Sequence, residues 1–137
     1  MATGTAGTTA RSYQSHMVHY LRKKITKADA TLVVPLGYIP AGSVVIRGGV
    51  AVREAFNAGT NNRLDIGTVA DDDGFATDLA LGTVGVITAD EMATSNDFYV
   101  SEDTLINCTV DVTGTAATTG IAEVWIEYLV QDGLVNT

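Results

Sequence analysis

The chain has 137 residues, a hydrophobic fraction of 46%, a charged fraction of 18% and a formal net charge of −8. This length corresponds to one domain with enough apolar side chains for a core, which excludes wholesale disorder. The negative charge disfavours nucleic-acid binding, and no apolar run approaches the ~20 residues of a membrane span, so we expect neither nucleic acid nor a membrane as a partner.

The charges are distributed unevenly along the chain. All eight basic residues lie at or before Arg63, whereas residues 64–137 contain fourteen acids and no base. Such asymmetry is a feature of interaction surfaces. It also arises when the two halves of a chain attract each other within the fold, and both interpretations stay open at this point.

The N-terminal fifteen residues differ from the rest of the chain. Residues 1–15 are mostly Thr, Gly and Ala, and they lack the positive start and apolar stretch of a signal peptide. We therefore expect a flexible N-terminal arm over residues 1–15 and a single domain over residues 16–137. Cys108 is the one cysteine, so no internal disulfide can form, which suits a reducing compartment such as a bacterial cytoplasm.

The first half of the domain favours strands over helices. Residues 15–25 fit a helix or a strand, because Met17, Leu21 and Ile25 recur every four residues and also share strand parity; we favour a strand. Residues 32–35 and 37–41 are expected to be extended. Residues 43–56 give the strongest strand pattern, interrupted by Gly48-Gly49 as a bulge, bend or tight turn. Its apolar face is expected to comprise Val44, Ile46, Val50, Val52 and Phe56.

The second half continues with short strands and polar turns. Strands are expected at residues 63–67, 83–88, 98–100, 104–113 and 121–130, with a turn at Asp71–Gly74. Leu64 and Ile66 should point inward, as should two longer alternating sets: Ile106, Cys108, Val110 and Val112, and then Ala122, Val124, Ile126, Tyr128 and Val130. About eight strands with Gly, Asn and Asp turns predict an all-β protein, an antiparallel jelly roll or β-sandwich with an extended N-terminal arm.

The residue inventory offers little for catalysis. His16 and His19, the two histidines, fall on opposite faces of a strand, and Cys108 lies on an apolar face. No glycine-rich phosphate loop is present. The Asp71–Asp73 run fails the calcium-loop pattern, because the twelfth position from Asp71 is Gly82, and we expect an acidic turn instead. The sequence therefore predicts no enzyme, no catalytic residue, no metal and no cofactor.

Several motifs in sequence order resemble a known class of virion protein. They are Tyr38–Val45, Phe56–Thr60, Leu64–Thr68, Asp73–Leu79 and Thr119–Tyr128. Together they resemble the jelly-roll cement or decoration proteins of tailed bacteriophages, which sit outside an HK97-like capsid. The resemblance implies a homo-oligomer that lies across junctions between capsomers and helps the shell resist the pressure of packaged DNA. It implies no catalytic residues.

These features lead to one main hypothesis of function. The chain is expected to be a structural virion protein, made in the host bacterial cytoplasm, that binds the outer surface of a phage capsid and bridges neighbouring major capsid proteins. Homodimers are favoured and trimers are possible. The segment that should grip an acidic surface, on the capsid protein or on a sister subunit, carries Arg11, Tyr13, His16, Arg22, Lys23 and Lys24.

A second surface is expected on the last strand. Glu123, Trp125 and Glu127 share a face that mixes charge with an aromatic ring, and Trp is enriched in interface anchors, so we expect an oligomer interface there. Exposed aromatics beside polar groups also suit sugars. The alternative function is accordingly a head-fibre or receptor-binding module that recognises host-surface glycans.

Overall fold

A computed structural model describes residues 17–92 and 95–130, which contain eight strands and one short 3-10 helix. The arm, with Arg11, Tyr13 and His16, lies outside the described residues. The elements are β1 (Val18–Thr26), η2 (Lys27–Asp29), β2 (Val33–Ile39), β3 (Val44–Glu54), β4 (Asn61–Thr68), β5 (Ala76–Ala80), β6 (Gly85–Thr88), β7 (Thr104–Thr113) and β8 (Ile121–Leu129). Within these ranges, no helix has the length and apolar character needed to cross a membrane.

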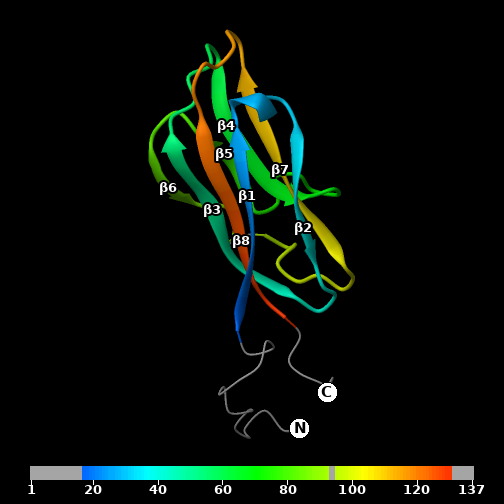
Figure 1. Ribbon diagram of the computed structural model, residues 1–137. Coiled ribbons are helices and arrows are strands. Elements are labelled where there is room, and N and C mark those ends of the chain that lie inside the picture. The colour runs from blue at the N-terminus through cyan, green and yellow to red at the C-terminus, as the bar shows by residue number, and fades with distance from the viewer. Residues whose placement is uncertain (1–16, 93–94, 131–137) are drawn as a thin grey trace, which may run out of the picture.

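The strands form two four-stranded antiparallel sheets. The front sheet has the order β1-β8-β3-β6 and the back sheet the order β2-β7-β4-β5, as Figure 1 shows with the front sheet toward the viewer. The first strand pairs with the eighth, the second with the seventh, the third with the sixth and the fourth with the fifth. This nested pairing is a long hairpin rolled into a sandwich, so the predicted jelly-roll fold is confirmed.

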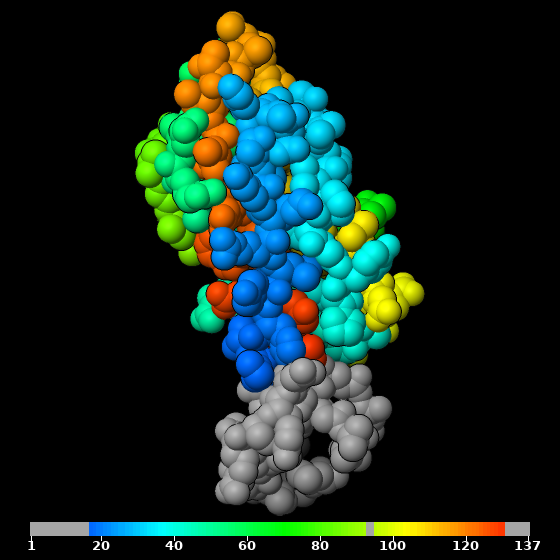
Figure 2. Space-filling view, in the orientation of Figure 1, coloured from blue at the N-terminus to red at the C-terminus, as the bar shows by residue number. Residues whose placement is uncertain are grey.

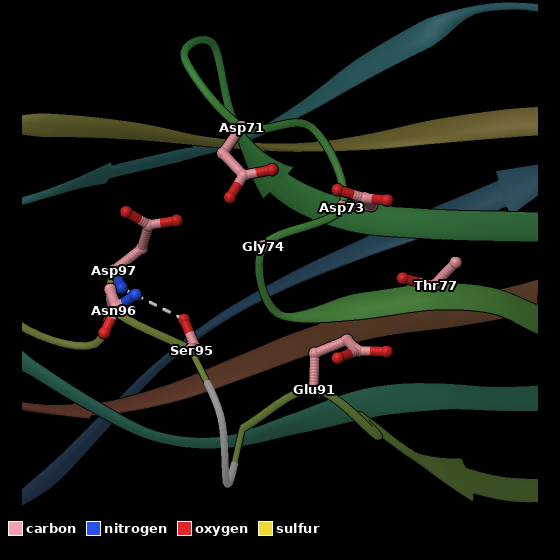
Figure 3. Close-up of a pocket in the computed structure, with 8 residues that line it drawn as sticks. All are labelled: Asp71, Asp73, Gly74, Thr77, Glu91, Ser95, Asn96 and Asp97. Carbon is pink, nitrogen blue, oxygen red and sulfur yellow. Dashed lines mark hydrogen bonds between the residues drawn. The ribbon is translucent and has the colours of Figure 1, made fainter.

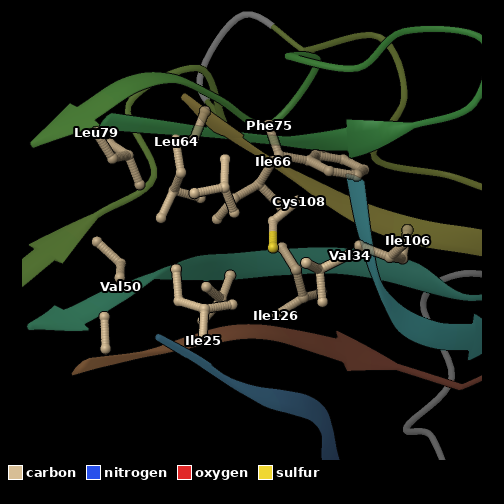
Figure 4. Close-up of a cluster of buried hydrophobic side chains, with 14 of the residues drawn as sticks. Ile25, Val34, Val50, Leu64, Ile66, Phe75, Leu79, Ile106, Cys108 and Ile126 are labelled. Atoms are coloured by element: carbon tan, nitrogen blue, oxygen red, sulfur yellow. The ribbon is translucent and has the colours of Figure 1, made fainter. Parts of the chain in front are cut away.

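The core fills the space between the sheets. Ile126 and Val50 reach in from the front sheet, and Leu64, Ile66 and Cys108 reach in from the back sheet (Figure 4). The strands alternate because successive side chains point to opposite faces, and one face of each sheet is covered by the other. The predicted inward sets of β4 and β7 are confirmed, and so is that of β8 from Ala122 to Tyr128; Val130 follows the strand and is partly buried.

Residues 18–26 are a strand, which settles the ambiguity between helix and strand. All nine residues of β1 pair in register with β8, from Val18 opposite Leu129 to Thr26 opposite Ile121. The alternation puts Leu21 and Ile25 toward the core, where the Leu21 side chain packs on Gly37 of β2. A strand satisfies the backbone hydrogen bonds along the whole open edge of β8, which a helix would leave unpaired.

Two expectations were wrong in detail. Val44 and Ile46 were predicted to face the core, but Val45 is the buried residue, because a register shift between Val45 and Arg47 changes the parity of β3. Gly48 and Gly49 remain inside that strand. Residues 98–100 were predicted to be a strand, but they form a single bridge, between Val44 and Tyr99.

Candidate functional site

The outward face of the front sheet carries the predicted interface residues of β8. Register places Trp125 between Arg22 of β1 and Gly49 of β3, and places Glu127 opposite Arg47. Lys24 lies opposite Glu123. We call this set the ion-pair patch: Arg22, Lys24, Arg47, Arg53, Glu123, Trp125 and Glu127. Figure 2 shows this side of the molecule, with β1 in blue beside β8 in orange.

Cross-strand ion pairs hold the patch together. Arg22 Nε lies 2.5 Å from Glu123 Oε2, and Arg53 Nη2 lies 3.6 Å from Glu123 Oε1. Arg47 binds Glu127 Oε2 through both Nε and Nη2, each at 2.7 Å. The hydrogen bond from Arg22, with its charge and that of Arg53, lowers the pKa of Glu123 below its ordinary value and outweighs the opposing desolvation. The same hydrogen bond raises the pKa of Arg22.

These pairs bear on the uneven charge of the sequence. Every ion pair found between described residues joins a base of the first half to an acid of the second half, including Arg63 with Asp78 and Asp111. Attraction within the fold therefore accounts for part of the asymmetry. The ion-pair patch still holds four bases against two acids, so it is positive on a chain whose net charge is −8.

Trp125 is half-buried by its own sheet. A Cβ at Gly49 would lie only 2.8 Å from Cη2 of the indole, so the ring rests on the glycine backbone. The flanking acids are engaged by arginines on the neighbouring strands. The face that the sequence singled out is thus the outward one. Its three residues contact groups that the sequence did not indicate: the side chains of Arg47 and Arg53 and the backbone of Gly49.

The basic cluster of β1 is divided by strand geometry. Arg22 and Lys24 point outward with the ion-pair patch, whereas Lys23 occupies the inward parity between Leu21 and Ile25 and is exposed on an edge strand. Lys23 and Lys24 are exposed, and neither forms an ion pair within 4.0 Å of any described residue. A lysine on the inward side of an edge strand also discourages unwanted strand pairing.

Carboxylates gather around an open pocket of about 530 Å³ (Figure 3). It lies between the β4–β5 turn and the β6–β7 connection, and it includes Asp71, Asp73, Glu91 and Asp97. The carboxylate oxygens of Asp71, Asp72 and Asp73 lie within 4.8 Å of one another. Oxygen ligands of this kind suit a hard cation such as Ca²⁺. Among the described residues, one buried side-chain oxygen or nitrogen atom lacks a hydrogen-bond partner, and it is Ser43 Oγ. Ser43 does not line this pocket, so none of the pocket's side chains is a buried polar group without a partner.

The two remaining reactive residue types sit in structural positions. Cys108 is fully buried in the core, where desolvation raises the pKa of its thiol to about 12. His19 stacks on Tyr128 with ring centroids 5.6 Å apart. The other histidine, His16, lies outside the described residues. The geometry around these two groups favours packing over chemistry.

No family model matches the chain, and no curated protein is similar to it in sequence. Among solved structures, the fold is similar to that of a chain in the cyanophage Pam1 capsid asymmetric unit. The TM-score is 0.57 at 15% sequence identity, and the match covers 95% of this chain and 97% of that chain. The similarity extends over the whole jelly roll and, at this level of identity, shows a shared fold.

Proposed function

We propose that the chain is a structural virion protein that binds the outer surface of a phage capsid and stabilises the shell by bridging neighbouring major capsid proteins. The observation that carries this proposal is the end-to-end likeness to a chain of the Pam1 capsid asymmetric unit, with 95% and 97% of the two chains covered. A jelly roll of the same extent in a phage head supports a virion role by analogy at the level of the fold.

The interior of the sandwich supports a structural role. Jelly rolls also serve as cupin enzymes, whose ligands converge inside the barrel. Here the corresponding space is filled by Ile126, Val50, Leu64, Ile66 and Cys108 (Figure 4). Among the described residues, the buried polar side chains are those of Ser43 and Asn107. This inventory supports binding through the surface rather than chemistry in the interior.

The capsid contact that we propose is the basic side of β1. Lys23 and Lys24 are exposed and lack an ion-pair partner in the described chain. Lys24 belongs to the positive ion-pair patch, and Lys23 is its neighbour on the edge strand β1. An acidic surface of the capsid protein would match them in sign. In this proposal Arg11, Tyr13 and His16 of the N-terminal arm add to the contact. Each contact is weak, and the many copies on one capsid hold the shell together by avidity.

The test is binding of the purified chain to bare capsids at several salt concentrations. Wild type should cosediment in a fixed ratio, and the Lys23→Ala/Lys24→Ala double variant should bind more weakly and with a smaller salt dependence. Lys27→Ala is the matched control. It also removes an exposed positive charge, but from η2, where Lys27 Nζ donates to the carbonyl oxygen of Thr118. Deletion of residues 1–15 tests the arm separately.

Two results would count against the proposal. Failure of the wild-type chain to bind capsids at any salt concentration would remove the capsid role. Equal loss of binding in the Lys27→Ala control would show that the basic side of β1 is not the contact. Glycan binding that disappears in Trp125→Ala would instead favour the receptor-binding alternative.

A further inference from the structure

A row of apolar side chains crosses the front sheet at the end where β1 begins. Val18 lies opposite Leu129, Leu129 lies opposite Val44, and Val44 lies opposite Tyr99. Directly opposed residues of antiparallel strands project from the same face. These four residues, which we call the apolar row, therefore lie side by side on the outward face across four neighbouring chain segments.

Three of the four side chains of the apolar row are exposed, and Val44 is half-buried. Val18 is 48% exposed, Leu129 41% and Tyr99 54%, while Tyr20, the next outward residue of β1, is 64% exposed. A tyrosine can bury roughly 150–250 Å², so these side chains together offer about 400 Å² per molecule. This area lies within the range of roughly 300–600 Å² that is typical of the largest apolar patch on a monomer, and such patches are often functional.

The surroundings of the row favour a second copy of the same chain as its occupant. The row itself carries no charge. The next set of outward residues across the sheet is Tyr20, Glu127 and Arg47, so the row is bordered by one negative and one positive side chain. In a two-fold contact the same patch meets itself, so a neutral row whose bordering arginine and glutamate are already paired can meet its own copy without an unmatched charge. Arg47 and Glu127 already pair with each other, so the row needs no charged partner.

The available area also fits self-association. Two apolar rows with their tyrosines would bury about 800 Å² in total, and the bordering residues bring the contact near the ~1,000 Å² that a specific interface needs. The Glu123–Trp125–Glu127 group is a weaker candidate, because its groups already pack on Gly49 and pair with arginines of the same chain.

We propose that two copies of this chain associate through the apolar row as a two-fold dimer. The inference goes beyond the proposed capsid contact, because it assigns a second surface of the same chain to self-association. Each molecule carries a net charge of −8, so the copies repel at long range. Added salt screens that repulsion and should strengthen the dimer, whereas it should weaken capture by the lysines of β1.

The test is sedimentation equilibrium of the purified chain without capsids, so it can fail independently of capsid binding. Wild type should be a dimer, and Val18→Lys or Tyr99→Lys should weaken self-association by at least about tenfold, since each places a charge in the contact. Val86→Lys is the matched control, because Val86 is a 69% exposed strand valine on the same face, opposite Ala51 and away from the row. It should dimerise like wild type.

Circular dichroism checks that each variant is folded, and Tyr20→Ser serves as the test variant if a lysine variant is not. A wild-type monomer at every concentration, or a wild-type trimer, would overturn the two-fold dimer. Unchanged association of the row variants would overturn the assigned surface, as would an equal effect of Val86→Lys. A dimer that salt weakens would overturn the apolar basis of the contact.

Discussion

Trp125 of β8 rests on the backbone of Gly49 of β3, in the middle of the outward face of the front sheet. The φ angle of Gly49 is +157°, and a Cβ there would run into the carbonyl oxygen of Ile87 and approach the indole Cη2 to 2.8 Å. The absence of a side chain at Gly49 therefore lets β6 and Trp125 approach β3 from two directions.

The first prediction concerns this contact. Gly49→Ala should lower the free energy of unfolding by about 1–3 kcal/mol, because the methyl group forces β6 or the indole to shift. Gly85→Ala is the control. It has a similar φ of +149°, but no other atom lies within 4 Å of its Cβ position. Urea unfolding should show a clearly larger loss for Gly49→Ala, and equal losses would mean that backbone strain rather than crowding sets the effect.

The second prediction concerns the acid sensitivity of Glu123. Its pKa is lowered in the folded state, chiefly by the hydrogen bond from Arg22, from an ordinary value of 4.5. A carboxyl group with a depressed folded pKa stabilises the fold above its unfolded pKa and loses that contribution as pH falls through the folded value. Wild type should therefore melt above Glu123→Gln at neutral pH, and the difference should close below pH 4.5. A difference that does not change with pH would show that the pair is not ionic.

Asp65 should behave in the opposite way. Burial raises its pKa, and the neighbouring charges of Asp78, Asp73 and Asp72 add to the shift, against the hydrogen bond that it accepts from the Asp78 N–H at 2.7 Å. Its ionised form therefore costs stability at neutral pH, and the cost is relieved as pH falls through the raised folded pKa. Asp65→Asn keeps an acceptor oxygen, so it should raise the melting temperature at pH near 7. A fall in melting temperature there would contradict this sign.

The fourth prediction concerns the reactivity of Cys108. The thiol is fully buried and its pKa is raised to about 12, so almost no thiolate exists near neutral pH. A chromogenic disulfide reagent should not react with the native protein, and it should titrate one thiol after unfolding in guanidinium. Reaction of the folded protein at the rate of a free thiol would show that the core opens at β7.

The sequence predicts the fold well wherever polar residues alternate with apolar ones. In β7, Asn107, Thr109 and Asp111 interrupt the apolar side chains, and the inward set is correctly assigned. In β3, Val44, Val45 and Ile46 are all apolar, so alternation cannot say which one is inward. A bulge decides it, and bulges depend on pairing with a neighbouring strand.

The candidate surfaces are only partly visible in the sequence. Alternation alone places Trp125 on an outward face, but nothing local indicates that Gly49 lies beneath it. The apolar row joins residues that are far apart in sequence, from Val18 to Leu129, and it exists only through the register of two strand pairings and one isolated bridge. Residues 98–100 were expected to be a strand because they are apolar, yet they contribute Tyr99 to the row through one bridge.

In the proposed function the chain belongs to a phage virion, and a cryo-EM map of that virion tests the capsid role most directly. The proposed function requires density for the jelly roll on the outer surface of the head, in contact with two neighbouring major capsid proteins, with the lysines of β1 facing the shell. Full heads that lack this density, or density for the chain at the tail or on fibres alone, would contradict it.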